Sequence, residues 1–361
     1  MGKMTLSAGK MARTAVSRRP RGLALVLSFA VLAAAAGGAA GCKSPAGKTG
    51  AGRAAGQAAA DGRLYPILEG GKYGFMNAAG KVVIAPRFDQ ASDFSEGLAA
   101  VQSGELWGHI RTTGETAVPF QYEWTAPFSE GLAIIQKGEV YGFIDAQGRT
   151  VIEPRFVTGG GFHDGRARVL VDDKWGFIDK TGKAVIPATF EQAYDFAGGL
   201  AAVKADGKWG YIDPGGNFVI RPAFVETYAF SGERAWVQTD AGIAYINRKG
   251  ETVLDRLPYL DAGNFFEGRA SVLDGDLYGF IDEQGKLVIR GRFRFVSIFA
   301  EGLAPVNTDG KWGYIDRNGK LVIGYQYDLA QPFAGGLAQV QIGDKIGYID
   351  RQGKYIREPK P

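Results

Sequence analysis

Two histidines are the residues of this sequence best suited to acid–base or metal chemistry. His109 and His163 are its only histidines. They occupy different positions of the repeat described below: His109 replaces the Tyr or Phe of a strand motif, and His163 takes a turn position that other units fill with Ser or Ala. A metal site needs several ligands at a suitable spacing. We therefore predict structural roles for both, and neither a metal site nor a catalytic residue.

Carboxylates recur at one position of the chain, each followed three residues later by Gly. A glycosidase would need two carboxylates that face each other across a sugar. Recurrence at one position instead favours backbone capping, because Asp first and Gly fourth suit a type I turn followed by a residue with positive φ. The members are Asp179, Asp213, Asp282, Asp316 and Asp350.

Aromatic side chains are the third group with chemical potential. A row of Trp and Tyr could stack on glycan rings, but thin β-units also need such rings as core, and we expect Trp209 to be core. Positions that depart from the repeat are better candidates for a partner surface. These binding candidates are Arg111 where Asp is expected, Trp124, Trp236, Arg292 with Arg294, and the run Gly159-Gly160-Gly161.

The elements that must position these residues are tandem repeats. Two markers define them: an aromatic-Gly pair at a spacing of 34 residues in seven cases and 35 in one, and a Phe that precedes the next pair by 13 residues. The pairs are Tyr73-Gly74, Trp107-Gly108, Tyr141-Gly142, Trp175-Gly176, Trp209-Gly210, Tyr278-Gly279 and Trp312-Gly313, with degenerate copies at Ile243-Ala244 and Ile346-Gly347. The Phe residues are Phe94, Phe128, Phe162, Phe196, Phe230, Phe265, Phe299 and Phe333.

The pattern inside a unit predicts strands. Short apolar runs alternate with Asp/Gly turns, as in residues 200–230, and no unit offers ten uninterrupted residues at helical spacing. We predict an all-β chain of nine antiparallel β-meanders of about 34 residues, arranged as a propeller-like array, with an open solenoid or superhelix as the alternative. Nine main strand sets but only eight linking pieces give no sign of terminal strand exchange.

Two residue types refine the predicted meander. The Gly beside each ring should permit close approach of a neighbouring strand. Proline should end hydrogen bonding after the third strand. The prolines concerned are Pro86, Pro119, Pro154, Pro187 and Pro222.

The repeat resembles the bacterial WG-repeat family in its KWGYID motifs at residues 208–213 and 311–316. The resemblance covers residues 64–357 and implies β-rich repeats without a shared catalytic residue or cofactor. Unit six departs most, because Ile243-Ala244 replaces its marker and an extra residue lies between Gly250 and Phe265.

The N-terminal part predicts export. A basic stretch leads into an apolar run at residues 23–36 and then into small residues, the pattern of a secretory signal. That run is shorter than the roughly 20 residues of a membrane-spanning helix. The ending Ala39-Ala40-Gly41-Cys42 resembles the lipobox of bacterial lipoproteins, which implies lipidation of Cys42. We therefore expect a signal peptide at 1–41, a lipidated Cys and flexible linker at 42–63, repeats at 64–357 and a tail at 358–361.

Charge and composition bound the function. The formal net charge is +4, yet residues 1–21 carry six basic and no acidic side chains, which leaves the remainder near −2. This distribution argues against nucleic acid as a partner. Lys43 after the cysteine favours the outer membrane, periplasm or cell surface over the inner membrane.

The sequence thus predicts a monomeric, membrane-anchored lipoprotein of the cell envelope without a cofactor, a non-catalytic binding or scaffold module for an envelope protein or polysaccharide. The alternative is a propeller-type carbohydrate-binding protein or carbohydrate-active enzyme. An enzyme should gather acidic and aromatic side chains in one pocket, whereas a scaffold should present an extended face.

Overall fold

The computed structural model describes residues 62–359, in which every regular element is a β-strand. The strands form nine antiparallel sheets, called blades 1 to 9 here in chain order. The all-β prediction is confirmed. The signal peptide, Cys42 and nearly all of the linker lie outside the described residues.

Each complete blade contains four strands, which run from a short strand on one edge to a bulged strand on the other. The short strands are β4 (Gln90–Ala91), β8 (Trp124–Thr125), β12 (Thr158–Gly159), β16 (Gln192–Ala193), β20 (Glu226–Thr227), β27 (Phe295–Val296) and β31 (Leu329–Ala330). The second strands are β1 (Leu64–Glu69), β5 (Leu98–Ser103), β9 (Leu132–Lys137), β13 (Ala167–Val171), β17 (Ala201–Ala205), β21 (Arg234–Thr239), β24 (Ala270–Asp274), β28 (Leu303–Thr308) and β32 (Leu337–Ile342).

The third strands carry the aromatic-Gly marker, and the fourth strands close each blade on its outer edge. The third strands are β2 (Lys72–Asn77), β6 (Leu106–Arg111), β10 (Val140–Asp145), β14 (Lys174–Ile178), β18 (Lys208–Ile212), β22 (Gly242–Asn247), β25 (Leu277–Ile281), β29 (Lys311–Asp316) and β33 (Lys345–Asp350). The fourth are β3 (Val82–Phe88), β7 (Thr116–Tyr122), β11 (Thr150–Phe156), β15 (Ala184–Phe190), β19 (Phe218–Phe224), β23 (Thr252–Leu257), β26 (Leu287–Phe293), β30 (Leu321–Tyr327) and β34 (Tyr355–Arg357).

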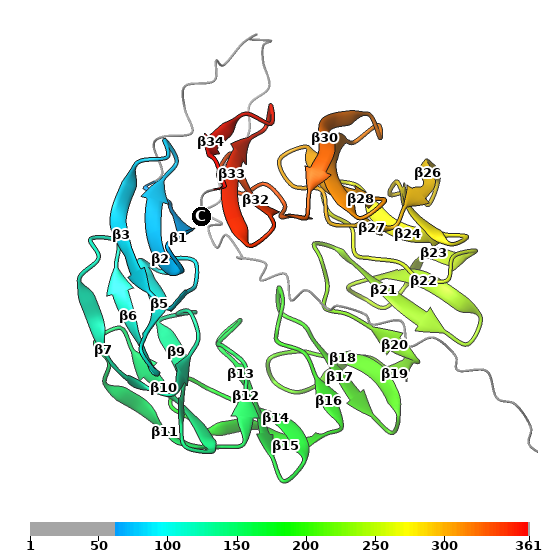
Figure 1. The fold of residues 1–361 in the computed structure, drawn as a ribbon. Coiled ribbons are helices and arrows are strands. Elements are labelled where there is room, and N and C mark those ends of the chain that lie inside the picture. Colours follow the sequence, from blue (N-terminus) through cyan, green and yellow to red (C-terminus); the bar gives the residue numbers. More distant parts are fainter. Residues whose placement is uncertain (1–61, 360–361) are drawn as a thin grey trace, which may run out of the picture. The chain divides into compact units, whose positions relative to one another are not determined.

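The blades are arranged in a ring, a nine-bladed β-propeller (Figure 1). Strands β3, β7, β11 and β15 lie on the rim, and β1, β5, β9 and β13 lie nearer the middle. The short strands pair with the second strands on the side away from the rim, so they form the inner edge of the ring. Of the two arrangements that the sequence left open, the propeller is confirmed and the open solenoid is wrong.

Ring closure uses side chains and not a shared strand. Blade 1 contains β1 to β3 and blade 9 contains β31 to β34, each from consecutive strands. The Tyr348 hydroxyl donates to the Pro66 carbonyl at 2.6 Å, and the Tyr65 hydroxyl donates to the Gly335 carbonyl at 2.8 Å. Arg357 pairs with Glu69 at 3.0 Å. These bonds join the two ends of the array, in agreement with the expected absence of strand exchange.

The second sequence marker is explained by contacts between blades. Phe162 packs edge-on against Phe143 of the preceding blade with ring centroids 5.0 Å apart, and Phe333 packs on Tyr314 at 5.1 Å. Equivalent pairs recur around the ring, and Tyr65 with Tyr348 replaces them at the closure. Edge-to-face pairs at this separation are favourable beyond the area they bury. The repeat length therefore reflects one aromatic contact per interface.

The Gly of the marker is required by the neighbouring outer strand. A Cβ at Gly210 would lie 2.6 Å from the carbonyl oxygen of Ile220. The pairing of β18 with β19 shifts register at this place, which is a β-bulge. The predicted close approach of strands is confirmed.

The prediction for the prolines was wrong in one respect. Pro86, Pro119, Pro154, Pro187 and Pro222 lie inside the fourth strands, which continue for two or three residues beyond each of them. The fourth strand is an edge strand with a bulge, so the missing N–H removes little hydrogen bonding there.

The departure that the sequence placed in unit six affects blade 6 and the connection from it to blade 7, and blade 7 is irregular as a result. Blade 7 has three strands, and only an isolated bridge from Ala262 to Val272 replaces the short strand. Arg256 has a φ of 49°, and Leu260 is 82% exposed. The extra residue is thus absorbed between β23 and β24 without opening the ring.

Candidate functional site

The recurring Asp residues cap turns. The Asp316 carboxylate accepts the amides of Asn318 and Lys320, both at 2.9 Å. The same pair of bonds is made by Asp145, Asp179, Asp213, Asp282 and Asp350. In Asp213 the amide of Asn217 is the main cause of a pKa below the usual aspartate value. The capping prediction is confirmed.

A second set of carboxylates links neighbouring blades. The Glu267 side chain accepts the amide of Gly302 at 2.9 Å, and Glu301 accepts that of Gly336 at 3.1 Å. Glu96, Glu130 and Asp164 make the same link to Gly131, Gly165 and Gly199. We call these tight loops the acidic turns. Each one fastens the loop of the next blade, so the repeated Glu has a structural partner.

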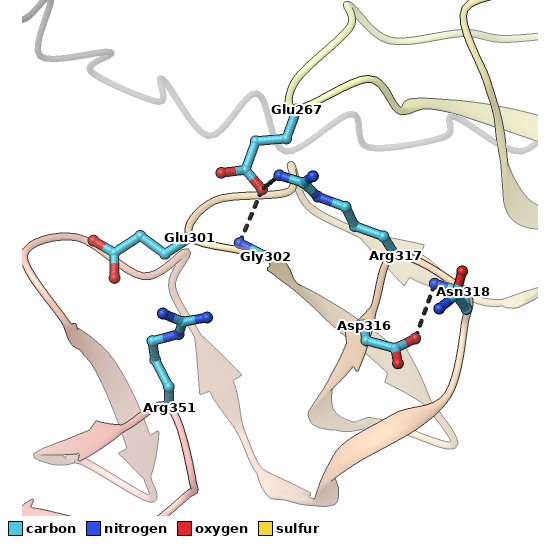
Figure 2. Close-up of a pocket in the computed structure, with 7 residues that line it drawn as sticks. All are labelled: Glu267, Glu301, Gly302, Asp316, Arg317, Asn318 and Arg351. Carbon is cyan, nitrogen blue, oxygen red and sulfur yellow. Dashed lines mark hydrogen bonds and ion pairs between the residues drawn. The ribbon is translucent and has the colours of Figure 1, made fainter. Parts of the chain in front are cut away.

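Two acidic turns and two capped turns enclose a shallow groove over blades 7 to 9 (Figure 2). We call it the polar groove. Its lining residues are Glu267, Glu301, Gly302, Asp316, Arg317, Asn318 and Arg351. Arg317 pairs with Glu267 at 2.8 Å, whereas Figure 2 shows the Arg351 guanidinium pointing toward Glu301 and Gly302 without a bond to either.

The electrostatics of the polar groove are largely balanced. Burial alone would raise the pKa of Glu267, but the hydrogen bonds from Arg317 and Gly302 outweigh it and lower that pKa below the usual glutamate value. Glu267 therefore remains ionised and paired at neutral pH. Within residues 62–359, the Arg351 side chain makes no hydrogen bond or ion pair, so its charge is available to a ligand in the groove.

Aromatic rings gather on the inner edge of blades 5 and 6. Tyr194 stacks on Trp209 with centroids 5.1 Å apart and planes at 15°, and it lies 5.9 Å from Tyr228. Tyr228 in turn meets Trp236 edge-on at 5.3 Å. We call these four residues the aromatic row. Trp209 and Trp236 are each 5% exposed, whereas Tyr194 is half-buried and Tyr228 is 40% exposed, so the tyrosines form the accessible part.

A charged pair from blades 4 and 5 borders the aromatic row. The Arg168 guanidinium donates to Asp195 at 2.8 Å and to the carbonyl of Ala193 at 2.9 Å, and it lies over the Trp175 ring. A Cβ at Gly160 would lie 2.3 Å from the Asp195 carboxylate. The run of glycines singled out in the sequence thus leaves room for this ion pair.

The charges of two further carboxylates act on Tyr228. Burial is the main cause that raises the pKa of Tyr228, and the negative charges of Glu226 and Asp261 raise it further. Glu226 also raises the pKa of Tyr194, after burial and the effect of Tyr228 itself. The Arg168 charge acts in the opposite direction on the pKa of Tyr194, so the charges that act on Tyr228 are acidic and those that act on Tyr194 are of both signs.

His109 has the structural role that the sequence predicted, and His163 lies in a turn where its backbone pairs with that of Arg166. His109 is fully buried, bonds through Nε2 to the Ala126 carbonyl at 3.0 Å and packs on Phe128. Burial lowers the pKa of His109 to about 4. Within residues 62–359, no three His, Cys, Asp or Glu side chains are grouped as metal ligands. The same residues include no helix long and apolar enough to span a membrane.

The five predicted binding residues are not brought together. Arg111 is the exposed last residue of β6 in blade 2, and Trp124 is a 39% exposed residue on the inner edge of blade 3. Trp236 is core, which corrects its placement at the surface, although it supports Tyr228. Arg292 donates to the Gly319 carbonyl and lies over Phe293, and Arg294 is exposed just after blade 7.

Arg292 has equivalents elsewhere in the ring. Arg87 and Arg155 make the same bond to a glycine of the next blade, at 2.7 and 2.6 Å, and each lies over the Phe that follows it. Arg292 is therefore a structural residue of the repeat and not a departure from it.

Sequence reasoning missed Tyr194 and Tyr228. The signal was present, because the equivalent position holds Ser92, Ala126 and Gly160 in three other units. An aromatic residue at a position of small residues marks a departure as clearly as a changed marker does.

The chain matches the family model described as WG containing repeat. The matched residues are 73–107, 107–141, 141–175, 175–209, 209–241, 278–312 and 312–345. The gap between 241 and 278 includes the irregular connection before blade 7. No curated protein matches the chain in sequence.

Several solved structures are similar in fold. A structure titled as the eukaryotic initiation factor has a TM-score of 0.59 at 12% identity, and the alignment covers 81% of this chain and 94% of that one. BamB from Moraxella catarrhalis has a TM-score of 0.43 at 12% identity, with 72% and 90% covered. Dihydro-heme d1 dehydrogenase NirN has 0.44 at 13%, with 82% and 73% covered. At these identities the likeness concerns the fold alone.

Proposed function

The chain belongs to the family of WG-containing repeats, and we propose that its ring is a non-catalytic binding scaffold held at the cell envelope by a lipid on Cys42. One observation carries the first half of this proposal. The repeated Asp and Glu residues, which have the chemistry for catalysis, are bonded to backbone amides of turns and neighbouring blades. A ring whose signature residues serve folding has its surface left for binding.

The second half rests on the leader pattern in the sequence. The apolar run before Cys42 and the lipobox-like ending support export and lipidation, and Lys43 supports an outer membrane, periplasmic or cell-surface location. In this arrangement residues 43–63 tether the ring to the membrane. A protein or polysaccharide of the envelope is the expected partner.

Lipidation and partner binding are tested together in the native host. We expect the intact chain to incorporate labelled palmitate, to fractionate with membranes and to capture envelope partners after cross-linking. Cys42→Ala should lose the label and the membrane fraction while its ring keeps the same thermal transition. Recovery of the same partners from cytosol alone would overturn the envelope location, and turnover of an envelope polymer by the purified ring would overturn the non-catalytic assignment.

A further inference from the structure

The tyrosines of the aromatic row, Tyr194 and Tyr228, form an accessible surface that the repeat pattern of the ring does not require. Tyr228 is 40% exposed, although a large aromatic ring is normally buried for stability. Its back is fixed by Trp236, and its neighbour Tyr194 is held flat against Trp209. The rings are therefore rigid, and a ligand would lose little affinity to ordering them.

The charges around these rings are negative and unpaired by cations. Within residues 62–359, the Glu226 side chain is exposed and makes no hydrogen bond or ion pair. Asp261 accepts the hydroxyl of Tyr278 at 2.8 Å and the amide of Ala262, but it has no cationic partner in that range either. The Arg168 guanidinium, which borders the aromatic row, is paired with Asp195 at 2.8 Å.

We propose that Tyr194 and Tyr228, with Glu226 and Asp261 beside them, bind a lysine or arginine side chain of an extended basic peptide segment in a partner protein. A cation placed over an aromatic face is attracted by the ring quadrupole, and adjacent carboxylates add a charge of the right sign. A neutral sugar would use the rings but gain nothing from the two carboxylates. Charge complementarity therefore favours a cationic side chain over a neutral sugar as the ligand.

This inference deepens the proposed function, since it names the partner chemistry of one part of the ring. The polar groove is the weaker candidate, because Arg317 and Glu267 already pair there. Tyr194 and Tyr228 are also the only tyrosines at their repeat position among units that otherwise hold Ser, Ala, Gly or Gln. The binding surface is thus confined to one arc of the ring.

The test uses the full chain and a fluorescein-labelled hexalysine peptide, with affinity measured by fluorescence anisotropy at low salt. We expect Tyr228→Ala to weaken binding about tenfold and Glu226→Gln about threefold, whereas Tyr228→Phe keeps most of the affinity. Matched controls are Tyr325→Ala, a tyrosine 37% exposed on the rim, and Glu153→Gln, an exposed rim carboxylate. Both controls should bind as the unaltered chain does.

Further arms of the experiment identify the ligand chemistry. The fully acetylated peptide, which has lost its side-chain charges, should not bind. In 0.5 M salt the screening length is on the order of a few ångströms, so binding of the hexalysine peptide should be weaker than at low salt. Thermal transitions of all variants should coincide, because the altered side chains are exposed. Equal affinity of Tyr228→Ala and Tyr325→Ala for hexalysine, or no binding at all, would overturn the site.

The neutral polymer is tested in parallel with maltohexaose. Binding of maltohexaose that depends on Tyr228, without binding of hexalysine, would replace the cationic ligand by a sugar. Failure here is separable from failure of the scaffold proposal. If envelope partners are captured equally well by the unaltered chain and by Tyr228→Ala, the scaffold remains and this site is refuted.

Discussion

The polar groove of blades 7 to 9 and the aromatic row of blades 5 and 6 are built on the same repeat but expose different groups. In the groove, the carboxylates stand at positions that hold Asp or Glu in several other units, and they bond to backbone amides or to an arginine. In the row, the exposed tyrosines and Glu226 stand at positions where other units carry different residues, and the Glu226 side chain has no partner within residues 62–359.

This difference separates the residues that every blade needs for folding from the residues that occur in only one or two blades. A side chain needed in every blade bonds to the same backbone amide or packs at the same interface each time, so its role is to stabilise the fold. A side chain that is present in one or two blades and is exposed, such as that of Glu226, has no such partner within residues 62–359. The following substitutions test this separation, from the largest expected effect to the smallest.

Removal of a core ring should have the largest effect. Trp209 is 5% exposed, so Trp209→Ala should lower the free energy of unfolding by about 3 to 5 kcal/mol. Trp124→Ala removes a ring that is 39% exposed and serves as the control, with a loss below about 1 kcal/mol. Denaturant titration followed by circular dichroism measures both. An unchanged midpoint for Trp209→Ala would place that ring outside the core.

The Gly of the aromatic-Gly marker gives a steric test. A Cβ at Gly210 would meet the Ile220 carbonyl at 2.6 Å, whereas a Cβ at Gly324 has no atom within 4 Å. We expect Gly210→Ala to destabilise the ring by roughly 1 to 3 kcal/mol and Gly324→Ala to leave it unchanged or slightly more stable. Thermal unfolding of the two variants side by side decides the matter. Equal transitions would show that the close approach of strands is not needed.

His109 gives a test that depends on pH. Its pKa of about 4 in the folded chain lies below the ordinary value of 6.5, so the unfolded chain takes up the proton first as pH falls. Stability is therefore complete above the ordinary value and is lost between it and the lowered one. His109→Phe, the residue of the equivalent Phe143, should be more stable than the unaltered chain by about 2 kcal/mol at pH 5, relative to the difference at pH 8. Parallel stability–pH curves for the two chains would contradict this.

The paired carboxylate of the polar groove should have the smallest effect. Because the pKa of Glu267 is lowered, its contribution is present above the ordinary glutamate pKa and is lost as pH falls through the lowered value. Glu267→Gln should cost less than about 1 kcal/mol at pH 7, and the difference should vanish in acid. The matched control is Glu153→Gln, an exposed carboxylate outside the groove, which should leave the unfolding midpoint at pH 7 unchanged. A constant penalty across pH would assign the effect to packing.

The regular part of this fold could be predicted from sequence because the same pattern of residues recurs from unit to unit. The Asp turns, the marker Gly and the number of blades followed from spacing alone. Closure of the ring could not be predicted, since it depends on Tyr65 and Tyr348, which lie at opposite ends of the repeat array and meet only in three dimensions. Burial could not be predicted from sequence either. Trp124 and Trp236 look alike in sequence, yet Trp124 is exposed and Trp236 is core.

The same reasoning explains the partial prediction of the candidate site. The Gly159-Gly160-Gly161 run was a visible departure, but its purpose depends on Asp195, which comes from the next blade. Tyr194 and Tyr228 were hidden because tyrosine is common in the chain and only alignment of the units by position reveals them.

The central claim is that the departures, and not the repeated residues, hold the partner. Its most direct measurement is the amount of envelope partner that the full chain captures after cross-linking, compared among Tyr194→Ala/Tyr228→Ala, Glu267→Gln and the rim control Tyr325→Ala. The account predicts that only the double tyrosine variant loses the partner while all three keep their fold. Retention by the double variant together with loss by Glu267→Gln would contradict it.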